Sequence, residues 1–236
     1  WPALAYALIA IIYSGLVLSH LDFFAWHDDE SVFLLTAKAV YEGQSLYRDV
    51  WFNYPPAYAQ YLVAVFRLFG YGLTTARLAI MLTGLIGIAA VAAIAHHLRG
   101  AKAGVLAALL LATAPHYIVL SGAVMTEVPA VALATIGVLL SLLYVQRRDL
   151  GWLLASGVVL ALALLVKPTI WPAFVVPGIA ILLVGRRPGR IVLQGLAFSG
   201  AVLAPLAVDI LLTHPTEFVH QLAVTFGHSR EAFPLD

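Results

Sequence analysis

The chain has 236 residues, of which 62% are hydrophobic and only 11% are charged, and its formal net charge is +1. A soluble domain carries about 25% charged residues, and a water-soluble fold of this length has no interior large enough to bury such an apolar excess. The composition therefore excludes an ordinary soluble protein and gives no reason to expect nucleic acid as a partner. The chain has no Cys, which excludes disulfides and thiolate metal sites.

Several apolar runs approach the roughly 20 residues that cross a bilayer as a helix. Backbone groups in lipid must be paired within their own segment, and the runs lack the polar alternation of a barrel, so we expect helices. The expected fold class is an all-α polytopic membrane protein with about seven transmembrane helices in residues 1–213, and residues 214–236 then begin an outer loop. Because the chain starts at Trp1 without Met and ends in polar sequence, we expect both ends to be cut from a longer protein. The runs are 3–20, 74–98, 103–121, 128–146, 150–166, 169–185 and 191–213.

The first connection, residues 21–73, is long and contains two shorter helical patterns. The first pattern ends near Gly43, and the second covers 57–69, between Pro56 and Gly70. Proline suits the start of a helix and glycine its end. Both patterns are too short or too mixed to cross a bilayer, and their aromatic faces suit helices that lie in the membrane interface.

Three other connections, residues 96–102, 146–149 and 185–190, are short and basic. The positive-inside rule assigns them to the cytoplasm, as topology signals rather than a binding patch. The first connection, the tail and the turn at Lys167 then lie outside. All carboxylates except Asp149 fall on that outer side, so we expect the chemistry of the protein to face outward.

A series of short motifs accompanies this topology. They are Asp29-Glu30, Leu46-Tyr47-Arg48-Asp49, Tyr54-Pro55-Pro56, Phe69-Gly70, Ala76-Arg77-Leu78, Thr126-Glu127-Val128-Pro129 and Lys167-Pro168-Thr169. Together they resemble the GT-C glycosyltransferases of the dolichyl-phosphate-mannose protein mannosyltransferase type, and bacterial relatives such as the aminoarabinose transferases that act on lipid A. The resemblance covers essentially the whole chain and implies the N-terminal helical module of that family, with two juxtamembrane helices in its first outer loop.

The resemblance also implies a reaction. A sugar would pass, with inversion, from a polyprenyl-phosphate donor to a lipid, glycan or protein acceptor on the outer (periplasmic) face of a bacterial plasma membrane. Asp29, supported by Glu30, is the expected catalytic carboxylate, since the acceptor hydroxyl must lose its proton to a base. Lys167, Arg48 and Arg230 are the expected cations for the donor phosphate, whose charge grows as it leaves.

Supporting roles are expected for Asp28, Glu127 and Tyr54. A divalent metal ion is an open alternative, because Asp29 and Glu127 offer the oxygen ligands that such ions prefer. No soluble nucleotide sugar is needed, which agrees with the absence of a glycine-rich nucleotide loop.

Structural roles compete with each of these assignments. Asp28 and Asp29 suit the N-terminus of the helix that follows, Lys167 can extend to lipid headgroups, and Arg48 can pair with Asp49. At the level of the whole protein, the alternatives are a transporter or flippase and a non-catalytic protein that binds glycan lipids. A transporter typically places charges near the bilayer midplane in paired repeats, whereas here the charges gather at one edge and no repeat is visible.

Overall fold

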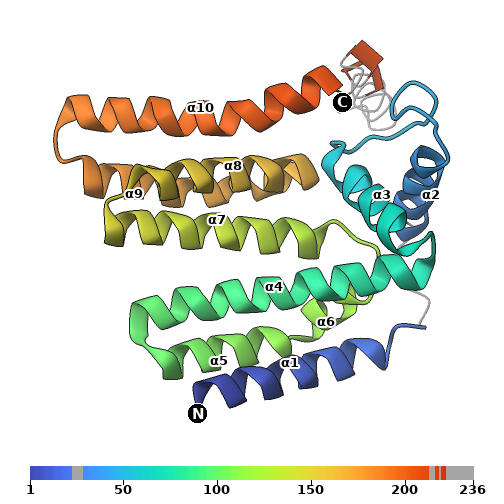
Figure 1. Ribbon diagram of the computed structural model, residues 1–236, viewed down its shortest axis with the longest axis horizontal. Helices are drawn as coiled ribbons and strands as arrows, with labels where there is room; N and C mark the ends of the chain where they lie inside the picture. Colours follow the sequence, from blue (N-terminus) through green and yellow to red (C-terminus); the bar gives the residue numbers. More distant parts are fainter. Residues whose placement is uncertain (23–28, 213–215, 218, 222–236) are drawn as a thin grey trace, which may run out of the picture.

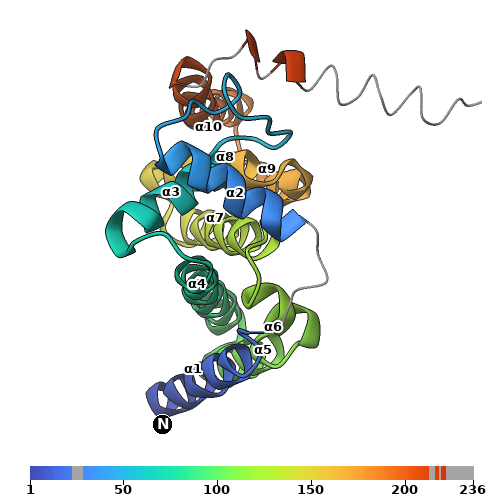
Figure 2. The same ribbon diagram turned by 90° about the vertical axis from the view of Figure 1, so that its right-hand side faces the viewer.

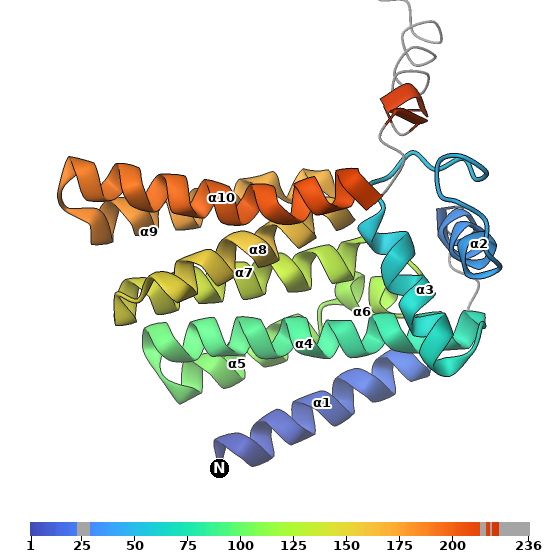
Figure 3. The ribbon, with the colours of Figure 1, turned by 45° about the horizontal axis from the view of Figure 1, so that its top comes forward.

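The computed structural model describes residues 1–22, 29–212, 216–217 and 219–221. Within these ranges the long elements are all helices, which confirms the expected all-α class. They run alongside one another as a bundle, while two shorter helices lie across one end of it (Figure 1, Figure 3). The bounds of the elements are α1 Pro2–Leu18, α2 Asp29–Tyr41, α3 Ala57–Phe69, α4 Leu73–Arg99, α5 Ala101–Ala112, α6 Pro115–Ser121, α7 Glu127–Arg147, α8 Leu150–Val166, η1 Pro168–Phe174, α9 Val175–Gly185 and α10 Pro188–Leu212.

Each of the seven predicted runs corresponds to helical structure. Among the described residues, four helical segments are long and apolar enough to cross a membrane: α4, α7, η1 joined to α9, and α10. The pair of α5 and α6, bent by 65°, makes a fifth if it counts as one span. The helices α1 and α8 have 17 residues each, the lower end of the length that spans a bilayer.

Prolines interrupt two of the predicted runs. The run 103–121 breaks after α5, and α6 starts again with Pro115 as its first residue. The run 169–185 begins as the 3₁₀ helix η1, which contains Pro168 and Pro172, and becomes α-helical only at α9. Proline lacks the amide hydrogen that a continuous helix requires and disfavours the helical conformation of the residue before it.

The two helices of the first connection end just before Gly43 and Gly70, as the sequence predicts. Gly43 and Gly70 have φ angles of 101° and 86°. Residues other than glycine rarely adopt this backbone conformation. One face of α3 is buried, with Tyr58, Leu62 and Phe66 each four residues apart. These side chains anchor α3 on the bundle, so α2 and α3 form a cap over one end of it, as the end-on view shows (Figure 2).

The two ends of the bundle differ in charge. The basic connections between α4 and α5, α7 and α8, and α9 and α10 lie at the end away from α2 and α3 (Figure 1). The start of α2, the start of α7 and the end of α8 lie at the cap end. The carboxylates of Asp29, Glu30 and Glu127, which begin α2 and α7, are therefore separated from the basic connections in the fold, as expected. The assignment of the cap end to the outer face and the domain boundary at residue 213 stay predictions.

Candidate active site

Asp29 is the first residue of α2, and its side chain is exposed. A carboxylate at this position is stabilised by the positive end of the helix dipole. Burial raises the pKa of Tyr54, and the nearby carboxylates of Asp29 and Glu127 raise it further. Tyr54 is therefore protonated at neutral pH and can act as a hydrogen-bond donor in the neighbourhood of carboxylates from two different helices.

Glu127 begins α7, and Lys167 caps the C-terminus of α8. The Lys167 ammonium donates a hydrogen bond to Oε1 of Glu127, and the two side chains are 26% and 30% exposed. The other carboxylate oxygen of Glu127 is buried and has no hydrogen-bond partner among the described residues, and the same is true of the Tyr58 hydroxyl. Both groups can therefore still accept or donate a hydrogen bond to a polar ligand.

Glu30 lies directly behind Asp29 and is buried in an ion pair with Arg77 of α4. Arg77 Nε donates to Oε1 at 2.8 Å and Nη2 to Oε2 at 2.7 Å, and the two side chains are only 5% and 10% exposed. The backbone N–H of Val124 also donates to Oε1, at 2.8 Å. Both oxygens of Glu30 are thus engaged, which favours a positioning role over proton transfer.

Arg77 also contacts the backbone at Leu21, close to the end of α1. Its third donor nitrogen, Nη1, bonds the carbonyl of Leu21. A single guanidinium thereby ties α4 to the residues on both sides of 23–28. Sequence reasoning gave Arg77 no role, although an ionisable residue in the first turns of an apolar helix is a recognised sign of function.

An aromatic cluster fixes Tyr54 in place. The ring of Phe33 in α2 contacts Tyr54 at 4.9 Å and Tyr58 at 5.0 Å between centroids, both edge to face. The Tyr47 hydroxyl donates to the carbonyl of Tyr54 at 2.8 Å. Because edge-to-face pairs are favourable beyond the area they bury, the loop that carries Tyr54 is held firmly against both helices of the cap.

The remaining predicted site residues are not brought into this group. Arg48 is exposed and forms two hydrogen bonds of 3.1 Å with Asp49. The Arg48 guanidinium and the Ser45 amide lower the pKa of Asp49 to about 2. No described contact joins Arg48 to Lys167, so its phosphate role stays a prediction. Asp28 and Arg230 lie outside the described residues.

The donor set for a metal ion is incomplete in the part of the chain that the structure describes. No three His, Asp or Glu side chains gather there in a group that fits an ion. Asp29 and Glu127 remain the predicted pair of ligands, with one oxygen of Glu127 already bonded to Lys167. We therefore derive no step of the chemistry through a metal.

The fold and the site together define a polytopic membrane protein whose acidic, phenolic and cationic side chains meet at one end of a helical bundle. The family model described as dolichyl-phosphate-mannose-protein mannosyltransferase matches residues 53–212, which is more than half of the chain. The chain belongs to this family and is a membrane glycosyltransferase of the GT-C type. Searches of curated proteins and of solved structures gave no significant match.

The family implies a lipid-linked sugar as donor, together with an acceptor. The matched range contains Tyr54, Arg77, Glu127 and Lys167 but starts after Asp29. The family match therefore does not bear on Asp29, which the fold places at the start of α2, at the same end of the bundle as the start of α7.

Proposed function

We propose that the protein transfers a sugar from a polyprenyl-phosphate donor to an acceptor hydroxyl at the outer face of the membrane, with inversion at the anomeric carbon. One observation carries the proposal. Asp29 at the start of α2 and the bonded pair of Lys167 and Glu127 lie at the same end of the bundle, so a base and a cation are both available at the cap end.

The chemistry requires one displacement. The acceptor oxygen bonds to C1 of the sugar while its proton passes to the Asp29 carboxylate, and the bond from C1 to the phosphate oxygen breaks. The polyprenyl phosphate leaves with the bonding electrons, and Lys167 stabilises its charge. Attack opposite to the leaving group accounts for inversion. Base catalysis of this kind contributes about 10²–10⁴-fold to the rate.

Glu127 and Tyr54 assist the cation and the substrate, and Glu30 with Arg77 supports the base. Glu127 orients Lys167, and the protonated Tyr54 donates a hydrogen bond to an oxygen of the sugar or of the phosphate. Glu30, clamped by Arg77, fixes the first turn of α2 and with it the backbone of Asp29. We propose Glu30 and Arg77 as positioning residues for the base.

Asp29→Asn tests the proposed base. We expect at least about 10²-fold loss of transfer, measured as acceptor glycosylation in membranes that contain the full chain. Polyprenyl-phosphate sugars that co-purify with the protein should remain, because the variant keeps the shape of the donor site; mass spectrometry of extracted lipids checks this. Glu42→Gln, an exposed carboxylate of the same connection, is the matched control and should retain full activity.

Full transfer by Asp29→Asn would remove Asp29 as the base. If the protein retained no polyprenyl-phosphate sugar and instead moved a solute across vesicles, the transporter alternative would replace the transfer reaction. Retention of the sugar lipid without any transfer by the unmodified protein would favour a glycan-lipid-binding protein.

A further inference from the structure

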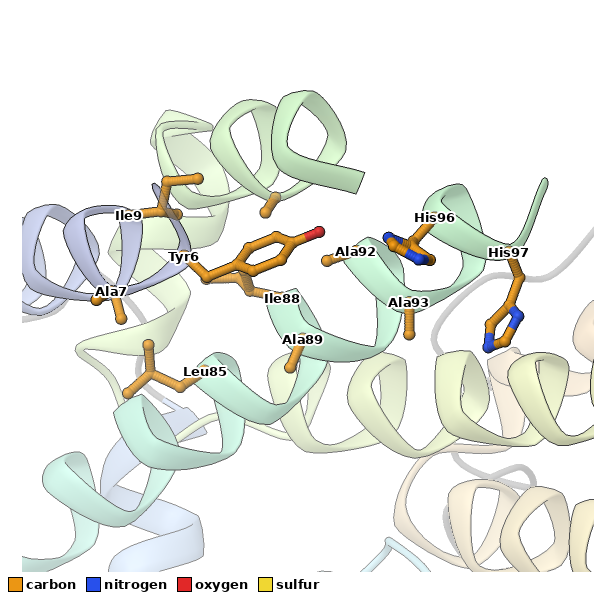
Figure 4. Close-up of a pocket in the computed structure, with 12 residues that line it drawn as sticks. Tyr6, Ala7, Ile9, Leu85, Ile88, Ala89, Ala92, Ala93, His96 and His97 are labelled. Carbon is orange, nitrogen blue, oxygen red and sulfur yellow. The ribbon is translucent and has the colours of Figure 1, made fainter. Parts of the chain in front are cut away.

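A cavity lies away from the cap, between α1, α4 and α5 (Figure 4). Its volume is about 610 Å³, within the range of pockets that hold organic ligands. One face of α4 lines it at every third or fourth position from Leu85 to His97, and Tyr6 reaches into it from α1. Small side chains such as Ala89 and Ala93 form much of the wall, which leaves room for a chain-like apolar ligand.

The length of this wall matches one leaflet of a bilayer. At about 1.5 Å per residue, the stretch from Leu85 to His97 is about 18 Å long. The hydrocarbon core is about 30 Å thick, so one leaflet is about 15 Å deep. A single lipid chain that enters from the basic end of the bundle would therefore lie along the cavity and reach its apolar floor near the middle of the membrane.

Basic residues lie at the end of the cavity near the turn from α4 to α5. His96 and His97 line the cavity and are exposed. Arg99, the last residue of α4, and Lys102, in the first turn of α5, are exposed close by in the sequence. None of these four residues takes part in the ion pairs formed among the described residues. Basic pockets between membrane helices on the cytoplasmic side are a known arrangement for anionic lipid headgroups.

We propose that this cavity binds one anionic phospholipid of the leaflet at the basic end. One acyl chain lies between α1 and α4, and the phosphate lies among His97, Arg99 and Lys102. The donor lipid is not the occupant, because its phosphate must reach Lys167 at the opposite end of the bundle. The connection between α4 and α5 thus binds lipid in addition to its part in setting the topology.

The test uses the full chain in nanodiscs of equal parts phosphatidylglycerol and phosphatidylcholine. Native mass spectrometry should find one retained phosphatidylglycerol and little phosphatidylcholine. Ala89→Phe places a ring in the cavity from an exposed position and should abolish retention. Leu82→Phe, also exposed on α4 but outside the cavity, should leave it unchanged.

A second pair of variants tests the basic residues at this end of the cavity. Arg99→Gln with Lys102→Gln should weaken the preference for phosphatidylglycerol about fivefold for each cation removed. Arg186→Gln with Arg187→Gln makes the same charge change at another connection of the same end and should have no effect. Equal retention of both lipids, persistence of the lipid in Ala89→Phe, or equal losses in both double variants would overturn the proposal.

Discussion

At the scale of single residues, the buried ion pair of Glu30 and Arg77 joins the cap helix α2 to α4. Arg77→Ala would leave the Glu30 carboxylate buried without its partner, so we expect the free energy of unfolding to fall by about 3–5 kcal/mol. Lys38→Ala breaks the exposed pair of Lys38 and Glu42, 3.8 Å apart, and should cost about 0.3–0.5 kcal/mol. Denaturant unfolding in detergent compares the two, and equal losses would show that the buried pair does not anchor the cap.

Lys167 allows a kinetic prediction at the same scale. Lys167→Ala removes the cation for the donor phosphate, so the KM for the donor lipid should rise by more than the KM for the acceptor. Lys167→Arg keeps a positive charge that can grip phosphate and should restore most of the donor affinity. Steady-state rates with each substrate varied in turn measure the difference. An equal change in both constants would count against contact with the phosphate.

At the scale of helices, the sequence predicts ends and breaks better than partners. The bounds of α3 follow from Pro56 and Gly70, since each residue restricts its own backbone. The pairing of Glu30 with Arg77 joins residues 47 positions apart, and that of Lys167 with Glu127 joins residues 40 positions apart. Neither pairing has a local signal, because both depend on how whole helices pack, and the same holds for the α1–α4–α5 cavity.

The packing of α1, α4 and α5 allows a prediction for Gly104. A Cβ at this position would lie 2.5 Å from the Tyr6 hydroxyl and 2.9 Å from the carbonyl oxygen of Ala92, and a backbone oxygen cannot swing aside. Gly104→Ala should therefore lower the free energy of unfolding by about 1–3 kcal/mol. Gly195→Ala, in α10 with nothing within 4 Å, should be neutral or stabilise by up to about 1 kcal/mol. The melting temperatures of both variants test this prediction. An unchanged melting temperature of Gly104→Ala would show that α1, α4 and α5 are not packed closely around Gly104.

At the scale of the whole molecule, the two ends of the bundle have different tasks. The cap end carries Asp29 and the ion pair of Glu127 and Lys167, together with Tyr54. The other end carries the basic connections, which the positive-inside rule assigns to the cytoplasm and which, by our proposal, lie beside a bound anionic lipid. By our proposal, the base and the cation for the donor phosphate then lie on one side of the membrane and the bound phospholipid on the other.

This orientation can be tested with introduced thiols, because residues 1–236 contain no Cys that would compete for the label. Glu42 directly follows α2 at the cap end, and Lys102 lies in the first turn of α5 at the basic end; both positions are exposed. We replace each of them in turn by Cys. In intact cells, a membrane-impermeant maleimide should label Glu42→Cys only, because the cap faces outward; Lys102→Cys should react only after the membrane is opened. The unmodified chain, which has no thiol, is the control for background. Labelling of Lys102→Cys in intact cells would reverse the topology and place Asp29 on the cytoplasmic side, where the proposed transfer at the outer face could not occur.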